Sequence, residues 1–302
     1  MKTTGLSRRH VLVTTAGLFM PGVLARAQTG GASNALAALE ARAGGRLGVC
    51  ILDSQTGRHI GNRMDERFAM CSTFKLPLAA VVLREADRGR LRLDERIAFS
   101  EKDMLSHAPV TGQHLTDGGM TLVALTEAAQ VTSDNVAANL IIRRLGGPAA
   151  FTALLRALGD RATRLDRDEP TLNLVLPGEV HDTTTPRAMA MTVARFLTGG
   201  LLTFASRDLL ISWMVATQTG SKRIRAGLPK DWRAGDKTGT ATADTMTDKC
   251  NDVAVAWPPG KDPMIVAAYF DSAVKSAATR DEDQAVLAEV GRIAAAWAVG
   301  RP

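Results

Sequence analysis

The chain has 302 residues, 45% of them hydrophobic and 23% charged, so it can bury a full core without cross-links. Its formal net charge is +6, but four basic residues and no acid lie in the first 27 residues, which leaves +2 for the remainder. So small a charge, without any basic run, excludes nucleic acid or an anionic membrane surface as the expected partner.

The N-terminus predicts export. Ser7-Arg8-Arg9 precedes an apolar stretch from Val11 to Leu24 and the small-residue pattern Ala25-Arg26-Ala27. This order is typical of a twin-arginine signal peptide, here residues 1–27, cleaved near Ala27. A membrane anchor is the alternative, but the stretch is short for a bilayer span and contains glycine and proline. We therefore expect a soluble periplasmic or secreted protein with no membrane contact after cleavage.

The cysteines and histidines predict neither disulfides nor a metal site. Cys50, Cys71 and Cys250 are odd in number and lack metal-ligand spacing. A twin-arginine substrate generally folds before it reaches the oxidising compartment, so we expect three reduced thiols. The five histidines are scattered and form no HxH or HExxH grouping, so we expect no metal and no other cofactor.

The first predicted element is a β-hairpin, because Leu47–Asp53 and Arg58–Asn62 are β-prone runs separated by Ser54-Gln55-Thr56-Gly57. From Ser72 to about Phe204, apolar residues recur at three- and four-residue spacing, which predicts helices. The predicted helices span residues 72–88, 122–131, 136–145, 148–158, 186–197 and 207–217. Strand character returns in residues 233–240, 253–257 and 264–270, and a last helix is expected at 281–299.

Strands at both ends of the chain and helices in the middle predict a two-lobed α+β fold. Residues 28–63 and 216–302 would form an antiparallel five-stranded sheet flanked by helices. Residues 64–215 would form an all-helical lobe. A cleft between two such lobes is the default position of a functional site.

Ser72-Thr73-Phe74-Lys75 is the first candidate for chemistry. The i, i+3 spacing places a hydroxyl and an amine on one helix face. The hydroxyl also lies at the positive end of the helix dipole. A lysine whose pKa is depressed can accept the proton of a nucleophilic serine. Taken alone, the pair is a weak signal, and the ordinary interpretation of an N-cap serine and a solvated lysine is favoured.

Ser133-Asp134-Asn135 and Lys237-Thr238-Gly239 are two further triplets that carry polar chemistry. Separately, the first could be a helix cap and the second a strand-end turn. Together with Ser72-Thr73-Phe74-Lys75, in this order, they match the motif set of class A β-lactamases and penicillin-binding proteins.

A fourth segment distinguishes between those two groups. Arg167-Asp168-Glu169-Pro170-Thr171-Leu172-Asn173, followed by Asp182, resembles the Ω-loop of class A β-lactamases, here residues 163–182. The resemblance extends from about Leu47 to the terminal helix and includes Gly235-Asp236 before the Lys237 triplet. It implies the β-lactamase/D,D-peptidase-like fold and hydrolysis of β-lactam antibiotics. It also implies antibiotic resistance and a monomer that needs no cofactor.

The resemblance also implies a role for each matching residue. The catalytic residues would be Ser72 as nucleophile, Lys75 as proton relay, Ser133 as proton donor to the lactam nitrogen and Glu169 as base for a catalytic water. The residues that bind the β-lactam substrate or the water would be Asn135, Asn173, Arg223, Lys237, Thr238, Gly239 and Thr240. Backbone N–H groups of Ser72 and Thr240 would form the oxyanion hole. In the family, Arg167 pairs with Asp182, and the Glu169–Pro170 peptide is often cis.

The chain departs from the family at the residue before Asn251. Relatives commonly carry Arg or Thr there, whereas Cys250 cannot bind a carboxylate as a guanidinium does. Arg223 is the expected replacement and Arg280 the weaker candidate. The alternative for Arg223 is an exposed helix charge.

Three smaller departures concern the edge of the expected cleft. The segment between Gly239 and Asn251 is a few residues longer than usual, which predicts an extended hairpin. His107 occupies a cleft-wall position or is an ordinary surface histidine. Ala241 stands where some carbapenem-hydrolysing members have a cysteine bridged to the equivalent of Cys71, so this bridge is absent.

Two other functions use part of the same machinery. A D,D-peptidase shares the serine, the lysine and the Lys237 triplet, but the Glu169 loop argues against it. A non-enzymatic β-lactam sensor domain needs acylation without turnover, and such sensors are usually tethered to a membrane.

Overall fold

The computed structural model describes Met1 and residues 21–300, with the backbone alone for residues 21–29. The arginine pair of the expected signal peptide lies outside the described residues. Helix α1 (Pro21–Ala43) includes the expected cleavage point near Ala27. Among the described helices, none is long and apolar enough to cross a membrane.

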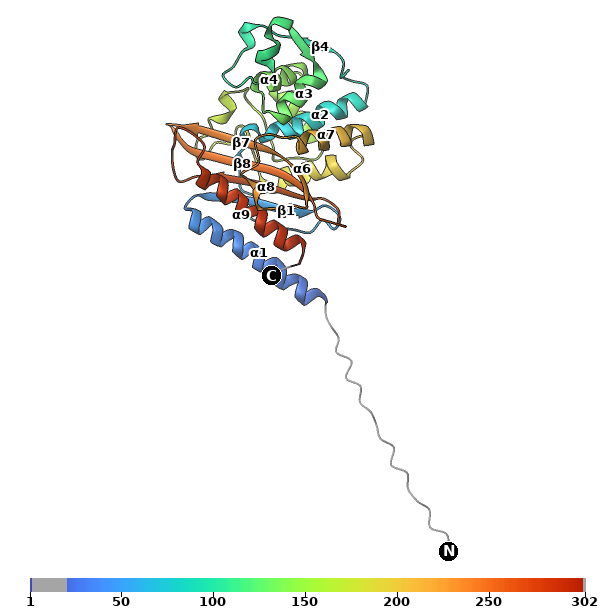
Figure 1. Ribbon diagram of the computed structural model, residues 1–302, viewed down its shortest axis with the longest axis vertical. Helices are drawn as coiled ribbons and strands as arrows, with labels where there is room; N and C mark the ends of the chain where they lie inside the picture. Colours follow the sequence, from blue (N-terminus) through green and yellow to red (C-terminus); the bar gives the residue numbers. More distant parts are fainter. Residues whose placement is uncertain (2–20, 301–302) are drawn as a thin grey trace.

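A five-stranded antiparallel sheet lies between two helical layers (Figure 1). Its strand order is β2-β1-β9-β8-β7, so the N-terminal hairpin pairs with the C-terminal strands as the sequence predicts. The α+β fold class is therefore confirmed. The strands are β1 (Arg46–Asp53), β2 (His59–Asn62), β7 (Arg233–Ala243), β8 (Met246–Trp257) and β9 (Met264–Asp271).

Both faces of the sheet are buried. On β8, Val253 and Val255 pack with the helices from the middle of the chain, whereas Ala254 and Ala256 pack with the helices near the two ends of the chain. Because successive side chains of a strand alternate between faces, one sheet supplies two hydrophobic cores. The helices that cover the face of Ala254 and Ala256 are α1, α8 (Ile224–Gly227) and α9 (Asp281–Ala298) (Figure 1).

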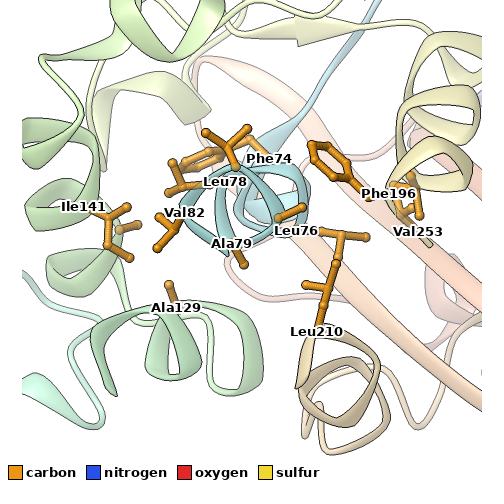
Figure 2. Packing of buried hydrophobic residues seen from close by; sticks show 14 of the residues in the cluster. Phe74, Leu76, Leu78, Ala79, Val82, Ala129, Ile141, Phe196, Leu210 and Val253 are labelled. Atoms are coloured by element: carbon orange, nitrogen blue, oxygen red, sulfur yellow. The ribbon is translucent and has the colours of Figure 1, made fainter. Parts of the chain in front are cut away.

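The middle of the chain packs around α2 (Lys75–Asp87), of whose thirteen residues eleven are buried. Figure 2 shows its side chains between Ala129 of α3, Ile141 of α4 and Leu210 of α7. A helix that is covered on all sides is a rigid support for residues at its start. The surrounding helices are α3 (Leu122–Val131), α4 (Asn135–Arg144), α5 (Pro148–Ala157), α6 (Pro186–Thr198) and α7 (Phe204–Val215).

Most predicted helices are confirmed, but two begin differently. The helix predicted at 72–88 starts as a 3-10 helix, η1 (Cys71–Phe74), and continues as α2. The helix predicted at 207–217 begins at Phe204, because the side chain of Thr203 accepts a hydrogen bond from the backbone N–H of Ser206.

Helix α1 and the first half of β8 are absent from the prediction. In α1, Leu36 and Leu39 are buried against the sheet and α9, and their three-residue spacing was a usable signal. Strand β8 begins at Met246 rather than at Val253. Its polar first half is held by ladders on both sides, where Lys249 lies opposite Ala241 of β7 and Asp271 of β9. Such pairing overrides the low β-propensity of a polar run.

Short two-stranded pairs also occur in the expected all-helical lobe. Strand β3 (Phe68–Ala69) pairs with β6 (Thr183–Thr184), and β4 (Arg96–Ala98) pairs with β5 (Gly119–Thr121). The first pair joins the segment before Ser72 to the end of the loop that contains Glu169. Three further 3-10 helices are η2 (Glu101–Asp103), η3 (Thr111–Asp117) and η4 (Thr171–Asn173).

Candidate active site

The hydroxyl of Ser72 lies between two groups that can accept its proton. Nζ of Lys75 donates to Ser72 Oγ at 3.0 Å, and Ser72 Oγ donates to Oε1 of Glu169 at 3.3 Å. Ser72 belongs to η1, and Cys71 before it has φ +46°, a left-handed conformation that is uncommon for a non-glycine residue. The strained turn is held because Cys71 is fully buried.

The ammonium group of Lys75 is completely buried and has several oxygen partners. It lies 3.0 Å from Glu169 Oε1, 2.9 Å from the carbonyl oxygen of Ser133 and 2.5 Å from Oδ1 of Asn135. Burial lowers the pKa of Lys75, and the charge of Glu169 opposes this change. A lysine in this state is closer than a free lysine to the neutral amine that can take a proton from Ser72.

Ser133 faces both lysines of the site. Its hydroxyl accepts a hydrogen bond from Nζ of Lys237 at 3.0 Å and one from Nζ of Lys75 at 3.4 Å. Burial and the nearby Lys75 cation hold the pKa of Lys237 well below its usual range. Ser133 has φ +64°, and Asp134 beside it fixes the turn by accepting from the backbone N–H groups of Ala137 and Thr111 at 2.9 Å each.

Glu169 is held through its backbone by a residue that the sequence analysis missed. Nδ2 of Asn139 donates to the carbonyl oxygen of Glu169, and the N–H of Glu169 donates to Oδ1 of Asn139, both at 2.9 Å. Asn139 lies four residues after Asn135 on α4, and this i, i+4 spacing was the available signal. At the carboxylate itself, Nδ2 of Asn173 donates to Oε2 at 2.6 Å.

The loop around Glu169 has the two family features that the resemblance implied. The Glu169–Pro170 peptide bond is cis. Nε of Arg167 lies 2.6 Å from Oδ2 of Asp182, whose side chain is fully buried. Oδ1 of Asp182 also accepts from the backbone N–H groups of Asp166 and Arg167, at 2.7 and 3.0 Å, so one carboxylate closes the loop.

Strand β7 passes directly beside the nucleophile turn at Gly239. A Cβ atom on this residue would lie 2.7 Å from the carbonyl oxygen of Met70 and 3.1 Å from Cβ of Cys71. Only glycine permits this approach, which brings Lys237, Thr238 and Thr240 to the site. The hydroxyl of Thr238 is 2.6 Å from that of Thr219, a second residue that the sequence analysis missed.

Arg223 is buried behind Thr240 and is no exposed helix charge. Its Nη1 donates to the carbonyl oxygens of Gly239 and Asn251, at 2.9 and 2.6 Å, and its Nη2 donates to Oγ1 of Thr240 at 2.6 Å. Arg280 is instead the N-cap residue of α9, where it pairs with Glu282 at 3.5 Å and with Asp283 at 3.9 Å. The structure therefore brings Arg223 to the other site residues through Thr240.

His107 lies beside the turn of Ser133. Its ring is exposed, with Nε2 3.1 Å from the carbonyl oxygen of Thr132, and its own carbonyl accepts from the N–H of Asn135 at 2.9 Å. All three cysteines are free and buried. Among the described residues, no group of three or more His, Cys, Asp or Glu could hold a metal ion.

A serine hydroxyl with a lysine at i+3, a second serine contacted by a second lysine, and a loop carboxylate define the class of penicillin-recognising serine hydrolases. Comparisons with known proteins agree with this class. A family described as the β-lactamase enzyme family matches residues 31–298. The chain belongs to this family, within class A.

Relatives and solved structures are similar over most of the chain. The β-lactamase L2 of Stenotrophomonas maltophilia is 47% identical over 264 residues, which cover 87% of this chain and 84% of the relative. The β-lactamase CTX-M-8 of Citrobacter amalonaticus is 41% identical over 285 residues, covering 94% and 96%. The structure of an ancestral (GNCA) class A β-lactamase is 54% identical with a TM-score of 0.81, covering 87% of this chain and 98% of that one. A β-lactamase structure from Xanthomonas campestris pv. campestris is 44% identical with a TM-score of 0.82, covering 88% and 97%.

Proposed function

We propose that this class A β-lactamase opens the β-lactam ring by acylating Ser72 and hydrolyses the acyl-enzyme with a water molecule activated by Glu169. The observation that carries the proposal is the position of Ser72 Oγ, 3.0 Å from Lys75 Nζ and 3.3 Å from Glu169 Oε1. Ring opening inactivates the drug, so the activity gives antibiotic resistance.

Acylation begins when Ser72 Oγ attacks the lactam carbonyl and its proton passes to Lys75 or to Glu169. The oxyanion that forms would be stabilised by the backbone N–H groups of Ser72 and Thr240, aimed at the charge as it develops. The ring then opens when Ser133 gives its proton to the lactam nitrogen. Lys75 and Lys237 both contact Ser133 Oγ, so the lost proton can be replaced from either lysine.

Deacylation needs a base near the ester. Two sets of contacts support Glu169 in this role: Asn139 is hydrogen-bonded to its backbone, and Asn173 donates to Oε2 of its carboxylate. We assign Glu169 as the base for the catalytic water and Asn173 as the residue that helps hold this water. General-base assistance of this kind is worth about 10² to 10⁴ in rate.

Substrate recognition follows from the charge of the site. Penicillins and cephalosporins carry a carboxylate, and we assign Lys237, Thr238 and Arg223 to its binding, with Arg223 acting through the hydroxyl of Thr240. The side chain of Asn135 would bind the amide of the antibiotic. Gly239 allows β7 to come close enough for these contacts.

We further propose that the protein is exported by its twin-arginine signal, cleaved near Ala27, and acts as a periplasmic or secreted monomer. The support is Ser7-Arg8-Arg9 with the apolar stretch that follows. The proposed lobes are residues 28–63 with 216–302, and 64–215.

The test has two parts, both done on the mature chain. Wild-type protein should hydrolyse one penicillin and one cephalosporin under steady-state conditions. Intact-mass spectra of Glu169→Ala mixed with a penicillin should show a long-lived adduct of the full mass of the drug, because the ester has lost its base. Ser72→Ala should show no adduct. Wild type should clear the adduct within the dead time.

The same spectra distinguish the alternatives. A D,D-peptidase or a β-lactam sensor would also be acylated at Ser72, but the wild type itself would hold the adduct for hours. That outcome would replace the hydrolase proposal.

A further inference from the structure

The tip of the β7–β8 hairpin contributes to a small buried cluster beside the catalytic residues. The cluster is separate from the two main cores and has Ala243 packed against it. We call it the tip cluster, and its members are Ala69, Cys71, Val175, Ala241 and Met246. Three parts of the chain thus meet here: the nucleophile turn, the Glu169 loop and the hairpin.

Met246 is the largest side chain of the tip cluster and is only 3% exposed. It is the first residue of β8, and only Asp244 and Thr245 separate it from β7. The strand register shifts between Ala241 and Ala243, as in a β-bulge. A bulge bends a strand and redirects its side chains, which accounts for a large apolar residue turned inward at an exposed hairpin end.

The hairpin is fixed on its other side by the segment after β9. The N–H of Asp248 donates to the carbonyl oxygen of Val274 at 3.1 Å, and the N–H of Ser272 donates to the carbonyl oxygen of Asp248 at 2.9 Å. The side chain of Asp248 also accepts from the N–H of Ser276 at 3.2 Å and from its hydroxyl. Nζ of Lys275 donates to the carbonyl oxygen of Asp244 at 3.1 Å. These hydrogen bonds hold the hairpin, and with it Met246, against the segment after β9.

The tip cluster reaches the deacylation residues through Val175. The N–H of Val175 donates to the carbonyl oxygen of Asn173 at 3.2 Å, and Asn173 donates to Glu169 Oε2 at 2.6 Å. Val175 is 6% exposed, whereas Leu174 and Leu176 on either side are 44% and 46% exposed. Of these three consecutive residues, Val175 is therefore the one whose side chain points inward, and it packs in the tip cluster.

We propose that Met246 is a positioning residue that holds Asn173 and Glu169 in place for deacylation, through the tip cluster that it shares with Val175. The inference rests on the proposed function, since it concerns the step assigned to Glu169. A misplacement of about 1 Å at a reacting group can cost up to a hundredfold in rate. Shortening Met246 would leave a cavity in the tip cluster, and this cavity would allow Val175, and with it Asn173, to be displaced. Acylation depends on Ser72, Lys75 and Ser133 and should be affected much less.

The test separates the two steps kinetically. For Met246→Ala we expect the deacylation rate constant to fall by about tenfold. The acylation rate constant should stay within about twofold, so acyl-enzyme accumulates at steady state and kcat and KM fall together. Met246→Leu should restore turnover, because it refills the volume. Val175→Ala should reproduce the effect from the opposite side. The double variant should be slowed less than the product of the two single effects.

Met264→Ala is the matched control, because Met264 is equally buried, at 2% exposure, but lies in the core on the other face of the sheet. It should lower stability without accumulation of acyl-enzyme. Equal loss of both rate constants in Met246→Ala, or the same accumulation in Met264→Ala, would overturn the proposal.

If Met246→Ala does not fold, the rate constants of Val175→Ala decide by the same criterion. If Glu169→Ala retains its adduct but Met246→Ala and Val175→Ala clear it at the wild-type rate, only the positioning role is wrong. If Glu169→Ala clears it too, the proposed function itself fails.

Discussion

Asn173 donates a hydrogen bond of 2.6 Å to Oε2 of Glu169. The other oxygen of this carboxylate, Oε1, faces Ser72 Oγ at 3.3 Å and Lys75 Nζ at 3.0 Å. The two oxygens are therefore differentiated by their partners, and the carboxylate has a single orientation toward the nucleophile.

Asn173→Ala should slow deacylation without abolishing it. A hydrogen bond to a charged group contributes about 1.5 to 3 kcal/mol, which corresponds to about tenfold to a hundredfold in rate. The deficit should be smaller than that of Glu169→Ala, since the base remains. Single-turnover decay of the acyl-enzyme, followed by intact mass, measures it. The control is Leu174→Ala, a change at a half-exposed side chain, and its acyl-enzyme should decay at the wild-type rate. An unchanged rate in Asn173→Ala would mean that Asn173 does not orient the base or its water.

Arg223→Ala should lower kcat/KM by about tenfold or more, as expected for a lost charge-assisted contact. The three hydrogen bonds of Arg223 also support the strand, so a lower melting temperature is expected. Arg223→Lys keeps the charge but loses the fork geometry, and it should recover only part of the activity. Arg280→Ala should have no effect on kinetics. If Arg223→Ala retains full kcat/KM, Lys237 alone anchors the substrate carboxylate.

The three cysteines should be unreactive in the folded protein and should all react after denaturation. Burial raises the pKa of Cys50 to about 12 and that of Cys250 to about 11, and it raises the pKa of Cys71 further. Thiols in this state carry almost no thiolate at neutral pH. Titration of the denatured, unreduced protein with a thiol reagent should count three groups. A count of one would reveal a disulfide.

Asp252→Asn should stabilise the protein more at pH 8 than at pH 5. Burial raises the pKa of Asp252 well above its usual range, with Asp236 adding to the shift and Arg223 opposing it. The folded state thus binds the proton more tightly than the unfolded chain. The resulting stability is complete below the unfolded pKa near 3.8 and is lost as pH rises through the folded pKa. Asn carries no charge at any pH and can still accept the hydrogen bond that the N–H of Ile224 donates to Asp252 Oδ2.

Urea unfolding of wild type and Asp252→Asn at pH 5, 6.5 and 8 measures this difference. We expect an advantage on the order of 1 kcal/mol at pH 8 that shrinks toward pH 5. Asp236, whose pKa burial raises to about 6 against the opposing charge of Arg225, titrates in both proteins. Because the charge of Asp236 raises the pKa of Asp252, the measured difference reports these two neighbouring carboxyl groups together. A difference that is equal at all three pH values would show that Asp252 is ionised throughout.

Changing both Arg8 and Arg9 to Lys should retain unprocessed protein in the cytoplasm. The arginine pair is the recognised element of the predicted signal, and lysine preserves charge without preserving the pattern. Cell fractionation with mass analysis of the N-terminus gives the result. Normal accumulation of processed protein in the periplasm would rule out the twin-arginine route.

The sequence by itself determined the class of site and the fold class. Ser72 with Lys75 is a local motif whose spacing is set by helical geometry, and Ser133-Asp134-Asn135 is a contiguous triplet, so both can be recognised before folding. The β-prone runs and the periodic helices were also local signals, and the pairing of the N-terminal hairpin with the C-terminal strands followed from their distribution along the chain.

The tertiary structure alone decided which residues support those motifs. Thr219 and Met246 act, or are proposed to act, through partners that are distant in sequence, so no local pattern marks them. Asn139 is marked only by its i, i+4 spacing from Asn135, and its partner Glu169 is distant in sequence. The burial of Arg223 and the length of β8 likewise depend on neighbouring strands. A short motif contains the groups that react. Their orientation comes from packing and hydrogen bonds between segments that only the folded chain brings together, because these interactions depend on distance in space and not on position in the sequence.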